Sequence, residues 1–263
     1  MTRAAVHSLA KRQVFEKALE LRRRGVLFDP RSAELEDVFR GSIDRFCDIA
    51  VRLRAHRRVL DVGAGHGMLL ALLSALGHEC HGLDIADQSA RYPGIYRDQP
   101  IAFQVCNVEV DPIPYPGDHF DAVVCCQVLE HFTHSHLPAM LEMRRVLRPG
   151  GIVEVDVPNV ASLRNRSRLL RGKNITFDYE EHYLRAEPVS YKGRSFYPLR
   201  HNREFTKREL ELLLATAGFR RIDAAFLKSR RYRTGLARIR SVGTALKDAV
   251  PSLRKSLIAY AEK

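Results

Sequence analysis

The residues with the clearest chemical meaning are three glycines at alternate positions, Gly63, Gly65 and Gly67. They follow the stretch "VLDV" at residues 59–62, and a strand that ends in glycines lets a nucleotide approach the backbone closely. A nucleoside triphosphate loop would continue with Lys and then Ser or Thr, where this chain has Met68 and Leu69. A dinucleotide fingerprint would place its third glycine at position 68. The loop excludes the first motif and departs from the second.

Two acidic residues accompany this loop. Asp61 precedes the glycines, and Asp84 lies near the end of the segment "HECHGLDI" at residues 78–85. A carboxylate at the end of a second strand can accept hydrogen bonds from both hydroxyl groups of a ribose. Dehydrogenases share this arrangement, so Asp84 alone leaves the ligand open.

Strand and helix patterns alternate around these residues. Apolar residues at helical spacing predict helices over 11–24 and 34–55. Short buried runs predict strands at 57–63, 78–85, 101–108, 120–127 and 151–159, with helices at 68–77 and 136–147. This alternation is typical of a doubly wound parallel α/β sheet.

The alternation stops after the fifth strand. Residues 158–204 are basic, aromatic and without a clear period, which predicts a lid or substrate-binding segment. A capped helix over 206–219 and strands at 220–227 and 256–263 follow, with a basic amphipathic helix over 236–250 between those strands. The predicted divisions are an N-terminal helical cap (1–55), a binding core (56–157), the lid (158–204) and a return to the core (205–263).

Further motifs identify a family. The fourth strand continues as "FDAVVCCQVLEHF" at residues 120–132, and "VLRPGG" follows at 146–151. Together with the glycine loop and Asp84, this set resembles the class I S-adenosylmethionine-dependent methyltransferases, especially the broad group with "LEH" after strand four. The likeness is dense over 56–157 and looser over 203–219. It implies a Rossmann-like sheet of seven strands with the last antiparallel, S-adenosylmethionine as cofactor, and methyl transfer as the reaction.

The resemblance also implies roles for the residues that match the motifs. Around the methionine and ribose, the three glycines admit the cofactor, Asp61 lies near its amino group and Asp84 binds the ribose hydroxyls. Gln127, at the end of strand four, contacts the methionine part.

Three further residues are expected around the adenine. Ile85 is the apolar neighbour of the ring, and Val108 offers it a backbone N–H. Asn107 occupies a position that is usually Asp and contacts the exocyclic amine, whose hydrogen an amide oxygen can also accept. For Ile85 and Val108, ordinary packing in the core is the alternative interpretation.

Histidines are the candidate bases, because a hydroxyl acceptor must lose a proton during methyl transfer. His131 follows Glu130 after strand four, and His201 comes from the predicted lid. Each could instead have a structural role, His131 at the entrance to the next helix and His201 in the "HNREFT" turn. The cluster "HFTHSH" has no adjoining carboxylates to complete a metal site, so no metal is predicted.

Charge is distributed unevenly along the 263 residues. The net charge is +12, and residues 161–263 contain 24 Lys and Arg against 10 Asp and Glu, a net of +14. This asymmetry is compatible with an acidic substrate, nucleic acid, an anionic membrane face or simply a solvated basic surface.

The five cysteines are irregularly spaced and predict reduced core thiols in a cytoplasmic protein. The sequence predicts neither a signal peptide nor a transmembrane segment.

The methyl acceptor is the least defined feature. The segment "PNVASLRNRSRLLRGKN" at residues 158–174 resembles methyltransferases of bacterial polysaccharide and lipid-linked sugar assembly, and less closely those of natural-product and quinone pathways. Arg164, Arg166, Arg168 and Arg171 suit a phosphorylated sugar, which favours O-methylation of an anionic sugar or glycan precursor. The alternatives are a small-molecule methyltransferase and, less favoured, a nucleic-acid methyltransferase or a catalytically idle binding protein. The oligomeric state is not predicted.

Overall fold

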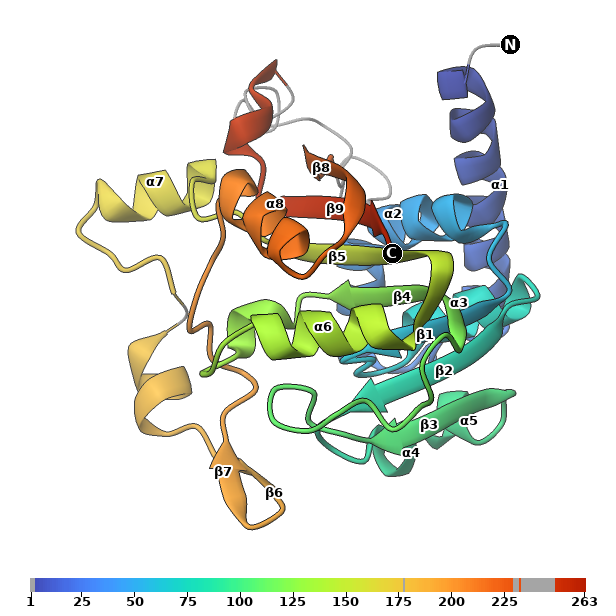
Figure 1. Cartoon of the computed structure of the whole chain (residues 1–263), viewed down its shortest axis with the longest axis horizontal. Helices are drawn as coiled ribbons and strands as arrows, with labels where there is room; N and C mark the ends of the chain where they lie inside the picture. Colours follow the sequence, from blue (N-terminus) through green and yellow to red (C-terminus); the bar gives the residue numbers. More distant parts are fainter. Residues whose placement is uncertain (1–2, 177, 229–231, 233–248) are drawn as a thin grey trace.

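The computed structural model describes residues 3–176, 178–228, 232 and 249–263, and Figure 1 shows their arrangement. A central sheet contains β1 (Arg58–Val62), β2 (Glu79–Asp84), β3 (Ile101–Val105), β4 (Phe120–Cys126), β5 (Leu147–Pro158), β8 (Arg220–Phe226) and β9 (Ser256–Glu262). The helices are α1 (Arg3–Arg23), α2 (Ala33–Leu53), α3 (Met68–Ala75), α4 (Gln88–Arg91), α5 (Pro93–Tyr96), α6 (Leu137–Val146), α7 (Leu163–Leu169) and α8 (Lys207–Thr216).

The strand order is β3-β2-β1-β4-β5-β9-β8. Strands β1 to β5 are parallel, and β9 pairs antiparallel with both β5 and β8. The chain moves outward from β1 to β3 and then returns to β4 beside β1, which creates a topological switch point at the carboxyl ends of β1 and β4. The predicted doubly wound sheet with an antiparallel last strand is confirmed.

Helices cover both faces of the sheet, and this explains the unbroken apolar run of β4. Val123 and Cys125 belong to the core that includes α6 and α8, while Ala122 and Val124 belong to the core that includes α2 and α3. A strand buried on both faces cannot alternate apolar and polar residues.

Local capping fixes two of the predicted helices. At α2, Ser32 Oγ accepts a hydrogen bond from Leu35 N at 3.2 Å. At α8, Thr206 and Glu209 form a reciprocal capping box, in which each side chain accepts from the other's backbone N–H. The predicted start of the helix at Thr206 is therefore confirmed.

Several local predictions differ from the structure. Helix α1 begins at Arg3 instead of residue 11, and α4 and α5 were not predicted. The segment 158–204 is not irregular, because it contains α7, a π-helical turn (Glu180–Leu184) and a hairpin of β6 (Val189–Tyr191) and β7 (Arg194–Phe196). We call residues 158–204 the insertion; its action as a lid stays a prediction. The predicted helix over 236–250 lies outside the described residues apart from its last two positions.

Two further predictions concern the cysteines and the membrane. All five cysteines are free and four of them are buried, as expected for reduced core thiols. Among the described residues, no helix combines the length and apolar character that crossing a membrane requires.

One face of β5 carries apolar residues, whereas the other face carries two acidic residues. Val153, Val155 and Val157 pack into the core beneath α6 and α8. On the opposite face, Glu154 and Asp156 are completely buried. Arg45 from α2 pairs with Asp156 at 2.9 Å, whereas Glu154 Oε2 accepts only from the thiol of Cys126, at 3.4 Å. Burial raises the pKa of Glu154 well above its ordinary value of 4.5; Asp156 adds to the shift and Arg45 opposes it.

The protonation of Glu154 predicts a pH-dependent stability. The folded state keeps a proton on Glu154 that the unfolded chain releases above pH 4.5. The contribution of this group is therefore complete below that pH and is lost as the pH rises. Glu154→Gln should raise the melting temperature at pH 8, by roughly 2–4 °C for each kcal/mol gained, and the gain should shrink towards pH 5. Thermal unfolding from pH 5 to 9 measures it, with surface Glu16→Gln as the control. Parallel pH profiles for wild type and Glu154→Gln would contradict the expectation.

Candidate functional site

A cavity of about 350 Å³ lies at the carboxyl ends of the strands, within the size range of small-molecule sites. Turns after β1, β2, β3 and β4 supply one part of its wall and the insertion supplies another. The wall includes Gly63 and residues 84–86, 106–109, 127–128, 131–133, 189 and 196–199. The cavity therefore lies between the carboxyl ends of the parallel strands and the insertion.

The glycine loop approaches its neighbours too closely for side chains. A Cβ on Gly63 would lie 2.3 Å from Cγ2 of Val128, in the turn after β4. A Cβ on Gly67 would lie 2.8 Å from Ile95 and Tyr96 of α5. Both glycines also have φ near +75°, a region that L-residues with side chains rarely adopt. Gly63 therefore shapes the cavity, whereas Gly67 allows α5 to pack on the loop.

Asp84 is held in position by three donors. The backbone N–H of Gly65 donates to Oδ2 at 3.0 Å, and Ala86 N and the side-chain amide of Gln88 donate to Oδ1 at 3.1 and 3.2 Å. An ionised carboxylate has about four acceptor positions. Asp84 lines the cavity, so it retains capacity for a hydroxyl donor there. Gly65 thus contributes by orienting Asp84.

The amide of Asn107 points its donor group away from its local partners. Its Oδ1 accepts from Glu109 N at 3.1 Å, which leaves Nδ2 buried and without a hydrogen-bond partner. Asn107 and the backbone of Val108 lie in the cavity wall. In this orientation the amide offers a donor, which suits an acceptor nitrogen of an adenine ring better than the exocyclic amine expected from the sequence.

Behind the glycine loop lies a buried ionisable group, Asp61. Burial raises the pKa of Asp61 to about 8, with Asp84 adding to the shift, and its Oδ1 has no hydrogen-bond partner. Arg45 is the cation that opposes this shift. Gln127, which has a positive φ of 55°, donates to the same Asp156 oxygen that binds Arg45. Nothing in the sequence distinguishes Arg45 from Arg40 or Arg52 on the same helix, so it was not predicted.

The structure divides the predicted site residues into two groups. The cavity wall contains Gly63, Asp84, Ile85, Asn107, Val108, Gln127 and His131. The wall does not include Asp61, Gly65, Gly67 or His201. Of the second group, Gly65 acts through Asp84, and His201 lies next to His131, with ring centroids 5.0 Å apart.

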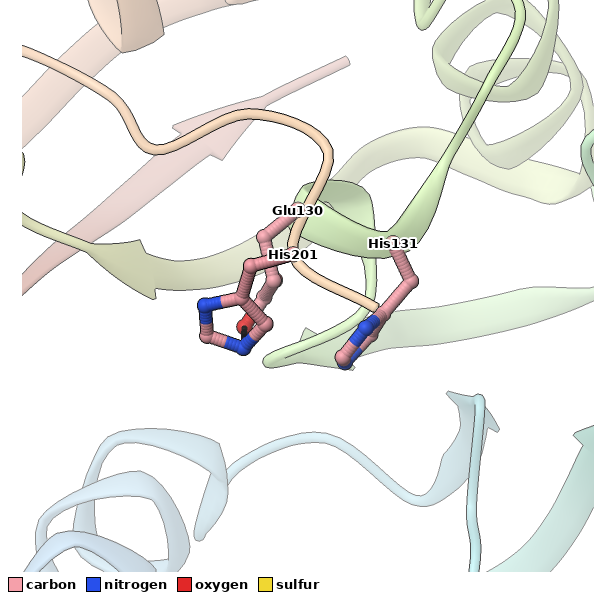
Figure 2. Close-up of side chains that lie close together, drawn as sticks. All are labelled: Glu130, His131 and His201. Atoms are coloured by element: carbon pink, nitrogen blue, oxygen red, sulfur yellow. Dashed lines mark ion pairs between the residues drawn. The ribbon is translucent and has the colours of Figure 1, made fainter. Parts of the chain in front are cut away.

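Glu130, His131 and His201 come together from two distant parts of the chain. Glu130 and His131 belong to the turn after β4, and His201 to the strand-like segment before α8; Figure 2 shows the three side chains pointing in the same direction. Glu130 is fully buried, and neither carboxylate oxygen has a hydrogen-bond partner. Its Oε1 is 3.9 Å from Nε2 of His201. Burial lowers the pKa of His131 to about 4, so this imidazole is neutral at pH 7.

Backbone hydrogen bonds attach the end of the insertion to this turn. The carbonyl of Glu130 accepts from Asn202 N at 2.7 Å and from Arg203 N at 3.2 Å. The side-chain amide of Asn202 donates to the carbonyl of His131 at 2.7 Å, and His131 Nδ1 bonds to the carbonyl of Arg200 at 2.8 Å. Because a carbonyl only accepts, Nδ1 carries the hydrogen and Nε2 of neutral His131 carries the lone pair.

A second attachment lies at the hairpin of the insertion. Asp111, after β3, accepts a hydrogen bond from the hydroxyl of Tyr191 and pairs with Lys192 Nζ at 2.7 Å. The hairpin is thereby held beside the cavity, to whose wall it contributes Val189 and Phe196.

The four arginines in and just after α7 do not belong to the cavity wall. Their guanidinium groups hydrogen-bond mainly to backbone carbonyls nearby: Arg164 to Ile175, Arg166 to Ala161, Arg168 to Asn174 and Arg171 to Ser167. Arg91 is the cationic side chain of the wall. The phosphate-binding role expected for the four arginines therefore has no support in the structure.

Residues 33–224 match the family described as "Methyltransferase domain", which covers well over half of the chain. The chain belongs to this family. The family and the fold together confirm the prediction of a class I methyltransferase with S-adenosylmethionine as cofactor.

Relatives of the methyltransferase include enzymes named for quinone biosynthesis. The "Ubiquinone biosynthesis O-methyltransferase" of Cereibacter sphaeroides (strain KD131) is 26% identical over 183 residues, which are 62% of this chain and 74% of that protein. The "Ubiquinone/menaquinone biosynthesis C-methyltransferase UbiE" of Pseudomonas fluorescens (strain Pf0-1) is 31% identical over 153 residues, 52% of this chain and 59% of that protein.

A solved structure shares the fold. The SAM-dependent methyltransferase from Archaeoglobus fulgidus superposes with a TM-score of 0.54 at 20% identity, over 87% of this chain and 98% of that one.

The contact between Gly63 and Val128 leads to a prediction with a matched control. Gly63→Ala combines a strained φ with a clash against Val128, whereas Gly77→Ala has a φ of +94° and nothing within 4 Å. Gly77→Ala should cost about 1 kcal/mol of unfolding free energy, and Gly63→Ala about 1–3 kcal/mol more. Only Gly63→Ala should also weaken the binding of S-adenosylhomocysteine. Urea unfolding and calorimetry measure both effects; equal losses in the two variants would exclude the close contact.

Proposed function

We propose that this methyltransferase transfers a methyl group to a hydroxyl of a small, largely apolar acceptor. The observation that carries the proposal is the composition of the part of the cavity wall that the insertion supplies. That part consists of Val189 and residues 196–199, an aromatic and aliphatic surface, and Phe132 from the turn after β4 lines the cavity as well.

The unpaired polar atoms of the site fit S-adenosylmethionine. Asn107 Nδ2 and Asp61 Oδ1 are buried without hydrogen-bond partners, and such atoms in native proteins usually await a ligand or water. We assign the adenine to Asn107, Val108 and Ile85, and the ribose hydroxyls to Asp84. The methionine end would lie towards Gln127 and Asp61, whose buried and unpartnered Oδ1 suits a hydrogen bond from the ammonium group.

The acceptor that we propose differs from the sugar or glycan precursor that the sequence favoured. A sugar phosphate requires several cationic or donor groups, and the arginines expected to provide them bond to their own segment. The relatives named for quinone biosynthesis favour the alternative, a small molecule. A hydroxylated aromatic ring with an apolar substituent fits both observations.

In this reaction the protein has to align the reacting groups, exclude water and help the acceptor hydroxyl to lose its proton. S-adenosylmethionine, when bound, supplies the methyl group on its sulfonium. Binding at Asp84 and Asn107 fixes the position of the donor, and the apolar wall of the insertion keeps water from the reacting groups. Neutral His131 presents its Nε2 lone pair beside the cavity, where an acceptor hydroxyl has to lose a proton.

Asp84 provides the test of the cofactor assignment. Asp84→Ala removes both acceptors for the ribose hydroxyls, so the affinity for S-adenosylhomocysteine should fall by about 10- to 100-fold, the equivalent of roughly 1.4–2.7 kcal/mol. Calorimetric titration measures the change. Asp98→Ala, at an exposed acid 14 residues further along the chain, should bind as wild type does. Unchanged affinity in Asp84→Ala would refute the ribose assignment.

The acceptor class can be tested with a panel of compounds. We expect S-adenosylhomocysteine to form with catechols or hydroquinones that carry an alkyl chain, and none above background with nucleotide-linked sugars. Substituting Tyr197→Ala should raise KM for the aromatic acceptor and leave the affinity for the cofactor unchanged. Turnover confined to sugar substrates would refute the proposal and restore the glycan alternative.

A further inference from the structure

We propose that Asp111 is a positioning residue that couples the cofactor side of the cavity to the acceptor wall. Asp111 is the last residue of the turn 107–111, which begins at the cavity with Asn107. This proposal deepens the function proposed above and rests on it for the places of the cofactor and the acceptor.

The turn 107–111 is folded around Asn107. The side-chain oxygen of Asn107 accepts from Glu109 N at 3.1 Å, and its backbone carbonyl accepts from Val110 N at 3.1 Å and Asp111 N at 2.9 Å. Three successive backbone N–H groups thus bond to one residue. Because Nδ2 of Asn107 is buried without a partner in the cavity wall, a ligand that accepts from this amide also fixes the backbone as far as Asp111.

The carboxylate of Asp111 holds the hairpin of the insertion, which is labelled β6 and β7 in Figure 1. Oδ2 of Asp111 accepts a hydrogen bond from the hydroxyl of Tyr191 and lies 2.7 Å from Nζ of Lys192. These two partners lower the pKa of Asp111 below its ordinary value of 3.8, so the group is ionised at pH 7. A two-stranded hairpin is marginally stable by itself, and its position therefore depends on such an attachment.

The attachment determines which face of the hairpin lines the cavity. Residues 192 and 193 both have a positive φ, 50° and 77°, as in the tight turns that keep two strands in register. Val189 and Tyr191 are two positions apart and so share a face, and Phe196 is the cross-strand partner of Val189. The rings of Tyr191 and Phe196 meet edge to face, with centroids 6.4 Å apart. The bond from Tyr191 to Asp111 orients this face, whose other two members both belong to the cavity wall.

The cofactor and the acceptor wall are linked through these contacts. A bound cofactor fixes the turn through Asn107, the turn fixes Tyr191 through Asp111, and Tyr191 fixes the apolar wall. The acceptor then meets a chamber that is already arranged, so less ordering is needed when it binds. Such a coupling is reciprocal, and a bound acceptor strengthens the binding of the cofactor by the same factor. An empty cofactor site correspondingly disfavours an acceptor that has no methyl donor.

Tryptophan fluorescence without any acceptor tests the coupling, because the chain contains no tryptophan. Phe196→Trp introduces one indole into the wall. Saturating S-adenosylhomocysteine should protect this indole from quenching by acrylamide and shift its emission to shorter wavelength. Adding Asp111→Ala should abolish both effects, although calorimetry still detects binding of S-adenosylhomocysteine. Adding Asp111→Glu, which keeps a carboxylate, should restore part of the protection.

The chain offers a matched control and a second reporter. Arg221→Ala removes another ion pair, with Glu262, whose residues do not belong to the cavity wall, and it should leave the protection of the indole unchanged. Leu199→Trp places the reporter at an exposed position of the same wall and replaces Phe196→Trp if that variant does not fold. Circular dichroism and the melting temperature establish that each variant is folded.

Kinetics provide a second measurement in the chain that keeps Phe196. Asp111→Ala should raise KM for an alkylated catechol by about tenfold, the scale of one lost hydrogen bond to a charged group. The value of kcat at saturating acceptor should change little, because Asp111 does not touch the reacting groups.

Two results would overturn the coupling. One is equal protection of the indole by S-adenosylhomocysteine with and without Asp111→Ala. The other is no change in the indole of either reporter variant when S-adenosylhomocysteine saturates it. Failure of the proposed function is distinguishable, because it shows as absent turnover of aromatic acceptors by wild type and leaves the quenching result as it is.

Discussion

The site depends on the close approach of two turns, one after β1 and one after β4. These strands are neighbours in the sheet although β2 and β3 separate them in the chain, so their carboxyl ends frame the switch point of the fold. Gly63 and Val128 meet there with no room for a further carbon atom. The turn after β4 must then continue away from the loop, and it does so through the strained backbone of Gln127 and on to Glu130 and His131. The cofactor side and the acceptor side of the cavity both start from this contact.

The sequence could predict the parts of this arrangement that short segments determine. The glycines, Asp84 and the capping box at Thr206 act within a turn or between consecutive strands, and the strand order follows once the parallel alternation is recognised. Gly67 shows a limit of such inference, since its small size serves the packing of α5. The contact of Gly67 with the cofactor stays a prediction, and the structure adds a second reason for a glycine at this position.

Residues that depend on tertiary contacts could not be predicted. Arg45 becomes a buried partner of Asp156 only because α2 packs on the face of the sheet to which Asp156 points. The meeting of Glu130 with His201 depends on hydrogen bonds to backbone carbonyls, which leave no trace in the side-chain pattern. The amide orientation of Asn107 depends on one bond to Glu109. Net charge misled for a related reason: it counts the arginines in and just after α7 but does not show that they bond to nearby carbonyls.

The way the insertion is attached has a consequence for how this enzyme can diversify. Its end is held largely by main-chain groups of residues 130–131 and 200–203, and its hairpin by Asp111. Between these anchors, Val189 and residues 196–199 line the cavity, and the ring of Tyr197 also contacts the guanidinium of Arg200. Substitutions at 196–199 can therefore change the shape and polarity of the acceptor chamber while the cofactor half stays intact. Because the two parts of the cavity come from different segments, a few substitutions in the insertion can admit a new acceptor without changing the cofactor half.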